Sequence, residues 1–177
     1  MKTRYGILLA VLMLVCSCGS KDFTDDILKM QSRPIDLKAC KDAVYLENGV
    51  EADFCDEDSV YKLILYIDSA SCSPCFVSHI TDYMETVETF DSLGIATLFV
   101  FEPKAGHENE VVSLIQSRYC PFRTAVVPGG SFSASNPHIP ESSMLHSFLL
   151  NADNEVVVVG NPDRNPKVKE LMLDMIK

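Results

Sequence analysis

The sequence lacks any cluster of basic residues after its first few positions. Lys and Arg together number 15 against 25 Asp and Glu, so the 177-residue chain carries a formal net charge of −10. A protein that binds nucleic acid needs lysines and arginines gathered on one surface, where they displace the counterions of the phosphates. We therefore expect no nucleic-acid partner.

The apolar run at residues 5–15 is too short to span a bilayer core of about 30 Å. It follows a positive start, Lys2 and Arg4, and it ends in a stretch of cysteine, serine and glycine. That arrangement is typical of a secretory signal, which is removed and takes no part in the fold. We therefore assign residues 1–17 to a signal peptide and expect the mature protein in the cell envelope.

Cys18 follows a serine and precedes Gly19, and this local sequence resembles the cleavage site of bacterial lipoproteins. The resemblance implies that Cys18 is acylated, becomes the first residue and anchors the protein to a membrane; a plain secretory signal cleaved nearby is the alternative. By the same resemblance, Gly19 favours the outer membrane, on its periplasmic or surface face. We expect residues 18–34 to form a lipidated, solvated tether and residues 35–177 to form the folded domain.

An odd number of cysteines remains once the signal region is set aside. They are Cys40, Cys55, Cys72, Cys75 and Cys120. The envelope is oxidising, so disulfides can persist there. If Cys72 pairs with Cys75, then Cys40 and Cys55 could close a loop of about 15 residues, which would stabilise the fold by roughly 3 kcal/mol. Alternatively, Cys40, Cys55 and Cys120 are ordinary small buried residues.

Hydrophobic periodicity predicts strands that alternate with helices and then a closing hairpin and helix. Asn48-Gly49 supplies the positive φ angles of a first hairpin turn. The predicted strands cover residues 43–46, 50–54, 60–67, 95–101, 123–127, 145–150 and 155–159. The predicted helices cover residues 76–90, 108–119 and 166–176, and a Gly- and Pro-rich loop at 128–140 holds one helical turn around Phe132. This order is typical of an α/β sandwich.

Cys72 and Cys75 enclose Ser73 and Pro74, directly after the strand predicted at 60–67 and at the start of a helix. Residues three apart on a helix share a face, so the two sulfurs can bond. Unpaired N–H groups and the positive end of the helix dipole would lower the pKa of the Cys72 thiol and make it the attacking nucleophile. Cys75 would then resolve the mixed disulfide. Pro74 suits an early helical position, because its missing N–H costs nothing there.

The same cysteine spacing also occurs in zinc sites, where it supplies half of the ligands. The sequence has no second Cys-x-x-Cys and no His-x-x-x-His that could supply the other half. A strand before the motif and a helix after it are the context that a redox pair requires. We therefore predict a redox-active pair and no metal, with a purely structural disulfide as the alternative.

Two histidines could lie near the cysteine pair. His79 stands four residues after Cys75 on the same helical face, so it either touches the site or is a partly exposed residue of a packed helix. His146 begins a later strand and could face the motif if the sheet closes as expected, or it could lie away from it. Asp68, at the end of the strand before the motif, is expected to stabilise a turn.

Residues 60–177 resemble the thioredoxin-like superfamily, in particular the membrane-anchored TlpA-type thiol–disulfide proteins and small thioredoxin-like lipoproteins of Gram-negative envelopes. The matching segments are the active-site strand and turn at 66–75, the hairpin at 147–156 and the closing segments at 159–162 and 165–171. The resemblance implies an α/β, three-layer sandwich. Its central sheet would be mixed, with helices on both faces and an N-terminal β-hairpin extension.

The sequence departs from this family at the segment opposite the cysteines. Redox-active members place a cis-proline just before the hairpin strand, where it presents backbone to the substrate. Here Leu145 stands at that position, and the nearest proline is Pro140. The tryptophan that usually precedes the motif is also absent, because Ala70-Ser71 stands there.

Three functions are compatible with these residues. The first is an envelope thiol–disulfide oxidoreductase that needs no cofactor, with Cys72 and Cys75 reducing disulfides of envelope proteins and Cys18 holding the enzyme at the membrane. The second is a docking module in which the Cys72–Cys75 disulfide is structural. The third is a copper carrier that uses both sulfurs and His146, since thiolates and imidazole suit copper; the copper-binding branch of the fold, however, places three residues between its cysteines.

Overall fold

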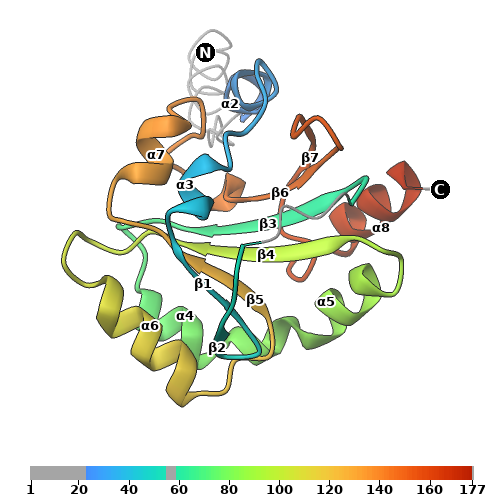
Figure 1. Ribbon diagram of the computed structural model, residues 1–177. Coiled ribbons are helices and arrows are strands. Elements are labelled where there is room, and N and C mark those ends of the chain that lie inside the picture. The colour runs from blue at the N-terminus through green and yellow to red at the C-terminus, as the bar shows by residue number, and fades with distance from the viewer. Residues whose placement is uncertain (1–22, 55–58, 177) are drawn as a thin grey trace, which may run out of the picture.

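Within residues 23–54 and 59–176, the part that this computed structural model describes, the chain forms one seven-stranded sheet with helices on both faces (Figure 1). The strands lie in the order β2-β1-β5-β4-β3-β6-β7. They are β1 (Val44–Glu47), β2 (Val50–Glu51), β3 (Lys62–Ile67), β4 (Ala96–Phe101), β5 (Arg123–Val126), β6 (Ser147–Leu150) and β7 (Val156–Val159). The helices are α2 (Thr24–Met30), α3 (Lys38–Lys41), α4 (Ser73–Ser78), η1 (Ile80–Tyr83), α5 (Met84–Asp91), α6 (Glu108–Ser117), α7 (Ser131–Ser135), η2 (Ser143–Leu145) and α8 (Pro166–Met175).

The sheet is mixed, as the sequence predicts. Strands β3, β4 and β5 run parallel, whereas β6 pairs antiparallel with β3 and β7 antiparallel with β6. All six residues of β3 are buried. The uninterrupted apolar run at 60–67 is therefore a central strand covered on both faces, which is the usual reason for such a run.

Side chains of β3 alternate between two cores, one on each face of the sheet. Leu63, Leu65 and Ile67 belong to the core under α4, α5, α6 and α8, while Ile64 and Tyr66 belong to the core under α2, α3 and α7. Figure 1 shows α4, α5 and α6 on one side of the strands and α2, α3 and α7 on the other. The predicted three-layer sandwich is confirmed.

The N-terminal hairpin extends this sheet at one edge. Asn48 and Gly49 have φ angles of 53° and 73°, the left-handed values that a two-residue hairpin turn requires. Strand β1 then pairs antiparallel with β5, next to the central parallel strands. The predicted hairpin extension is therefore present, and it adds two strands to the sheet.

The helix predicted at 76–90 is interrupted. Helix α4 ends at Ser78, a 3₁₀ turn η1 follows, and α5 begins at Met84. At the break the Ser78 hydroxyl donates to the carbonyl of Pro74 at 2.9 Å, a bond back to the preceding turn that bends helices. Apolar spacing could not reveal the break, because Ile80 and Tyr83 on the 3₁₀ turn still face the core.

The expectation of a solvated tether over residues 18–34 is not met in its described part. Met30 at the end of α2 is fully buried, and Phe23 and Ile27 pack against the same core. These three residues are spaced by four and three positions, so one face of α2 is apolar. The packed domain therefore reaches back at least to Phe23.

Several predictions concern residues outside the part that the structure describes. The signal peptide at 1–17, the acylated Cys18 and the partner Cys55 in the Cys40–Cys55 disulfide all lie there. Cys40 itself is buried. Among residues 23–54 and 59–176, no helix is both long and apolar enough to cross a bilayer. The lipid anchor and the second disulfide remain predictions.

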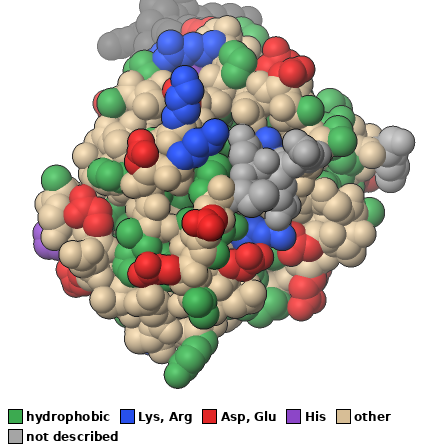
Figure 2. All heavy atoms as spheres, in the orientation of Figure 1, with side chains coloured by type: hydrophobic (Ala, Val, Ile, Leu, Met, Phe, Trp, Pro, Cys, Tyr) green, Lys and Arg blue, Asp and Glu red, His purple; other side chains and the backbone are tan. Residues whose placement is uncertain are grey.

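The surface reflects the acidic composition. On the face drawn in Figure 2, basic side chains gather mainly at the end where α2 lies, and acidic side chains are spread over the rest. On this face the acidic side chains are therefore not confined to one patch.

Replacing Met30 by alanine tests whether α2 belongs to the domain. Removing a fully buried methionine side chain leaves a cavity, so we expect Met30→Ala to lower the free energy of unfolding by about 2–5 kcal/mol. Leu28→Ala on the same helix is the matched control, because Leu28 is 60% exposed and its loss should change stability by about 0.5 kcal/mol or less. Urea denaturation of both variants is the measurement. Equal stabilities would contradict the packing of α2.

Candidate active site

The cysteine pair lies where the central strand leaves the sheet. Strand β3 ends at Ile67, and Cys72 is the N-cap of α4. The Cys72 sulfur is bonded to that of Cys75, whose Cα atom lies 5.2 Å away, and it also accepts the backbone N–H of Cys75 at 3.3 Å. The predicted Cys72–Cys75 disulfide is confirmed.

Both sulfur-bearing residues are exposed, whereas Ser73 between them is 4% exposed. Pro74 lies in the first turn of α4, where the missing N–H has no intrahelical acceptor to lose. Once the disulfide is reduced, the Cys75 N–H would favour a thiolate at Cys72, because a hydrogen bond to the charged form lowers a pKa. Cys120 differs, since burial raises the pKa of its thiol.

Two hollows flank the disulfide, and Cys72 lines both. The first, of about 410 Å³, is lined by Ser71, Cys72, Cys75, Phe76, His79, Asp82, Tyr83, Asp163 and Arg164. The second, of about 270 Å³, is lined by Ser69, Ser71, Cys72, Ser73, Pro74, Pro103, Lys104, His107, Glu110 and Val111. A substrate that reaches Cys72 would therefore contact one or both of these surfaces.

His79 lies in the hollow beside the pair, one of the two placements that the sequence leaves open. It lines the same hollow as Cys75, is well exposed, and its Nδ1 lies 3.6 Å from a carboxylate oxygen of Asp82. The second hollow has a similar exposed pair, in which His107 Nδ1 lies 3.1 Å from Glu110. Each hollow therefore has an exposed imidazole next to a carboxylate.

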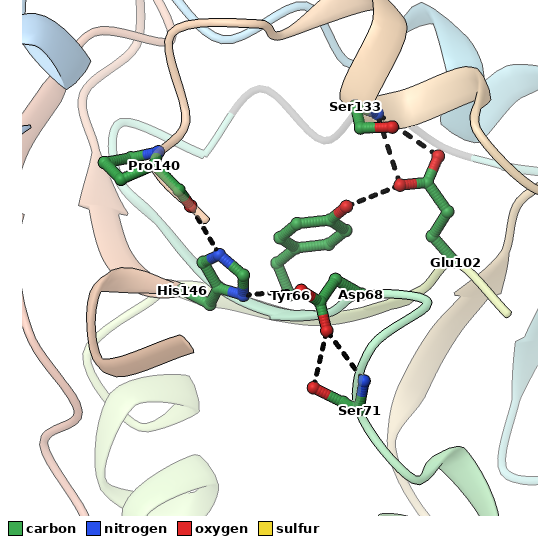
Figure 3. Close-up of polar contacts among 7 residues, drawn as sticks. All are labelled: Tyr66, Asp68, Ser71, Glu102, Ser133, Pro140 and His146. Carbon is green, nitrogen blue, oxygen red and sulfur yellow. Dashed lines mark hydrogen bonds and ion pairs between the residues drawn. The ribbon is translucent and has the colours of Figure 1, made fainter. Parts of the chain in front are cut away.

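His146 does not reach the sulfurs. Its ring is 4% exposed, and Nε2 lies 2.8 Å from the carbonyl oxygen of Pro140, while Nδ1 faces Asp68 at 4.0 Å (Figure 3). Neither cysteine lines the two hollows that His146 lines, although one of these hollows shares Ser71, Phe76, Tyr83 and Arg164 with the first hollow at the disulfide. The set of two sulfurs and His146 that copper would need is not assembled.

Asp68 stabilises the turn before the motif, as predicted. One of its oxygens accepts the backbone N–H of Ser71 at 2.9 Å and the Ser71 hydroxyl at 2.6 Å. Asp side chains commonly close turns in this way. Ser71 directly precedes Cys72, so the carboxylate of Asp68 fixes the approach of the chain to the disulfide.

The segment opposite the disulfide is a short 3₁₀ turn and not a cis-proline. No cis peptide bond occurs among residues 23–54 and 59–176, and Leu145 ends η2 with its side chain buried. The backbone N–H groups of Leu145 and His146 donate to the carbonyls of Ser142 and Ser143. These N–H groups are therefore not free to pair with the backbone of a substrate.

Sequence reasoning missed a buried carboxylate next to this site. Glu102 directly follows β4, is 2% exposed, and accepts the Tyr66 hydroxyl at 2.5 Å and the backbone N–H groups of Phe132 and Ser133 at 2.7 and 3.2 Å. Burial, and then the hydrogen bond to Glu102, raise the pKa of Tyr66, which stays a neutral donor. The sequence did contain a signal for Glu102, because it is an acidic residue directly after an apolar strand, as Asp68 is.

Sheet order, helices on both faces and a disulfide at the start of the helix after β3 together define a thioredoxin-like fold with a Cys-x-x-Cys disulfide. Solved structures share this fold. One is the thioredoxin domain of a thiol-disulfide oxidoreductase from Bacteroides vulgatus, with 14% identity, a TM-score of 0.51, and coverage of 73% of this chain and 90% of that one. Another is a thioredoxin-like protein in the oxidized form, with 14% identity, a TM-score of 0.53, and coverage of 84% and 96%.

A third structure is that of a protein from Chlorobium tepidum, assigned as a thiol:disulfide interchange protein DsbE. It has 13% identity and a TM-score of 0.51, over 69% of this chain and 84% of that one. No protein-family model and no curated protein matches the sequence. At these identities the likeness establishes the fold, and the chemistry must be argued from the site.

Removing the Glu102 carboxylate tests its structural importance. Glu102→Ala leaves the Tyr66 hydroxyl and two backbone N–H groups without an acceptor, so the free energy of unfolding should fall by at least about 2 kcal/mol. Glu110→Ala is the control, because Glu110 is exposed and such surface pairs contribute at most about 1 kcal/mol. The measurement is urea denaturation of the oxidised proteins. A loss no larger than that of the control would show that these donors find other acceptors.

Proposed function

We propose that the chain is a thiol–disulfide oxidoreductase of the cell envelope, with Cys72 as nucleophile and Cys75 as resolving thiol. The observation that supports this most directly is the exposed Cys72–Cys75 disulfide at the N-terminus of α4. A structural staple has no need of exposed sulfurs, whereas an exchange reaction requires the attacking sulfur to meet a second disulfide in line.

In the proposed reaction the reduced protein acts on a disulfide of another envelope protein. The Cys72 thiolate attacks one substrate sulfur, which forms a mixed disulfide and releases the other substrate sulfur as a thiolate. Cys75, as its thiolate, then attacks the Cys72 sulfur and releases the second substrate thiolate. The two electrons and two protons of the dithiol have then passed to the substrate, and a dithiol donor in the envelope must restore the pair.

The envelope location is supported by the N-terminal sequence. Residues 1–17 have the pattern of a signal peptide, and Cys18 stands where bacterial lipoproteins carry their lipid. We propose that acylated Cys18 anchors the domain to the outer membrane. An oxidising compartment is also where a protein that exchanges disulfides finds substrates.

A docking module with a permanent disulfide is the second candidate. It is favoured by the 3₁₀ turn at Ser143–Leu145, which uses the backbone N–H groups of Leu145 and His146 internally. Backbone pairing with an extended substrate at this segment would require the turn to open. Substrates of the first candidate would instead be bound by side chains of the two hollows beside Cys72.

Replacing Cys75 by serine separates these two functions. Without the resolving thiol, Cys75→Ser should accumulate mixed disulfides between Cys72 and its substrates in cells, visible as shifted bands on non-reducing gels that disappear with dithiothreitol. Cys72→Ser is the matched control, because it keeps the second thiol but lacks the nucleophile. Equal trapping by both variants, or none by either, would contradict the assigned roles.

The reduction potential of the pair provides an independent test. Equilibration of the oxidised protein with glutathione, read by thiol alkylation, should give a value between about −120 and −270 mV, the range of exchange catalysts. A value well below about −300 mV, or a bond that resists reduction until the protein unfolds, would identify a structural disulfide and favour the docking module.

A further inference from the structure

We propose that His146 is a positioning residue for the reaction proposed above. A proton on its Nδ1 atom is held against the Asp68 carboxylate, and Asp68 in turn binds Ser71 in the turn before Cys72. In this way His146 acts on Cys72 without contacting it. The proposal rests on the proposed function, because it concerns the reactivity of the same cysteine pair. It assigns a role to a buried histidine that contacts neither sulfur.

The tautomer of His146 follows from its surroundings. The Nε2 atom lies 2.8 Å from the carbonyl oxygen of Pro140. A carbonyl oxygen can only accept a hydrogen bond, so Nε2 must carry a hydrogen. In the neutral ring Nδ1 then has no hydrogen and presents a lone pair. Figure 3 shows Nε2 toward Pro140 and Nδ1 toward Asp68.

That lone pair has no hydrogen-bond donor. The Nδ1 atom is buried and unpartnered, and the nearest charged group is an Asp68 oxygen at 4.0 Å. Both atoms are acceptors, so in the neutral ring they repel, and a single proton on Nδ1 converts the contact into an ion pair. Because His146 is 4% exposed and Asp68 17% exposed, solvent screens this pair only weakly.

Asp68 connects the protonation state of His146 to the residue before the disulfide. Its other oxygen is the one that accepts the N–H and hydroxyl of Ser71, the residue before Cys72. His146 is also fixed to the same strand, because its carbonyl accepts the N–H of Tyr66 at 2.8 Å. The imidazole, the carboxylate and the turn before Cys72 therefore form one continuous set of contacts.

Other charged groups around His146 come from several elements. Within the cavity of about 810 Å³ that His146 and Asp68 line, these are Asp26 and Lys29 of α2, Glu102 after β4, and Glu141 before η2, with the Tyr66 ring 4.8 Å from the imidazole. Arg164, from the loop after β7, lines the smaller hollow that His146 also lines. Acids outnumber bases among these groups.

The charge of His146 should bias the equilibrium between disulfide and dithiol. Reduction by glutathione consumes two glutathione thiols, forms glutathione disulfide, and leaves Cys75 as a thiol and Cys72 as a thiol or thiolate. A positive ring favours the thiolate and hence the reduced protein. Imidazoles change charge between about pH 5 and 8, so the reduced share at a fixed glutathione ratio should fall as the ring loses its proton. Ionisation of Cys72 itself acts in the opposite direction.

Two substitutions test the role of the proton on His146 Nδ1. His146→Gln can keep a donor to the Pro140 carbonyl but has no group that titrates. Asp68→Asn can keep an oxygen for Ser71 and offers an amide N–H to Nδ1, which satisfies the lone pair without a proton. His138→Gln is the matched control, because His138 is also buried, but its Nδ1 atom accepts from Arg33 at 2.9 Å and it lines neither hollow beside the disulfide. Circular dichroism and urea denaturation confirm that each variant is folded.

The measurement is the equilibrium with glutathione at a fixed ratio between pH 5.5 and 8.5. We expect the equilibrium constant of wild type, divided by that of His146→Gln or Asp68→Asn at the same pH, to fall roughly two- to fivefold as the pH rises, because ionisation of Cys72 is common to all three proteins. His138→Gln should follow wild type. Nitrogen NMR of the ring in the oxidised protein should also show a proton gained at Nδ1 of wild type as the pH falls, with Nε2 protonated throughout.

Equilibrium constants of wild type, His146→Gln and Asp68→Asn that keep the same ratios at every pH would overturn the proposal while leaving the proposed function intact. A ring whose Nε2 lacks the hydrogen would also overturn it. If the disulfide cannot be reduced without unfolding, the proposed function itself is wrong, and so is any positioning role for His146.

Discussion

Burial of β3 on both faces is the constraint on which the rest of the structure depends. A strand whose six side chains are all buried can meet solvent only at its ends, so the chain leaves the sheet at Ile67 and enters α4 at Ser73 after the short Asp68–Ser71 turn. The cysteine pair lies at that exit, where sulfur meets solvent and the first backbone N–H groups of a helix. The exposed disulfide is therefore a direct consequence of a fully buried central strand.

The ends of the two central parallel strands bear carboxylates with different surroundings. Glu102 after β4 is saturated by the Tyr66 hydroxyl and by N–H groups of α7, so it stabilises the loop that covers this end of the sheet. Asp68 after β3 accepts both bonds of Ser71 on one oxygen, and its other oxygen faces the His146 imidazole at 4.0 Å. Glu102 therefore fixes a loop, whereas Asp68 lies between the turn before Cys72 and a buried imidazole.

The 3₁₀ turn before β6 changes how a substrate can be recognised. Its own carbonyls use the N–H groups of Leu145 and His146, and the Leu145 side chain points into the core. In the proposed reaction a substrate would instead meet the side chains of the two hollows, which include Arg164 and the His79–Asp82 pair in one and Lys104 and the His107–Glu110 pair in the other. Specificity should therefore depend on charge and shape at these side chains.

Sequence alone determined the features that depend on local pattern: the buried strand at 60–67, the Asn48-Gly49 turn, the helical turn at Phe132 and the pairing of Cys72 with Cys75. Apolar spacing and turn chemistry act within a few residues, so they can be recognised without knowing which distant segments pack together. Only the tertiary structure decided that α2 packs into the domain, that His146 faces Asp68 instead of the sulfurs, and that Glu102 binds Tyr66. Those outcomes depend on which strands lie side by side, since β3 and β6 are about 80 residues apart in sequence and neighbours in the sheet.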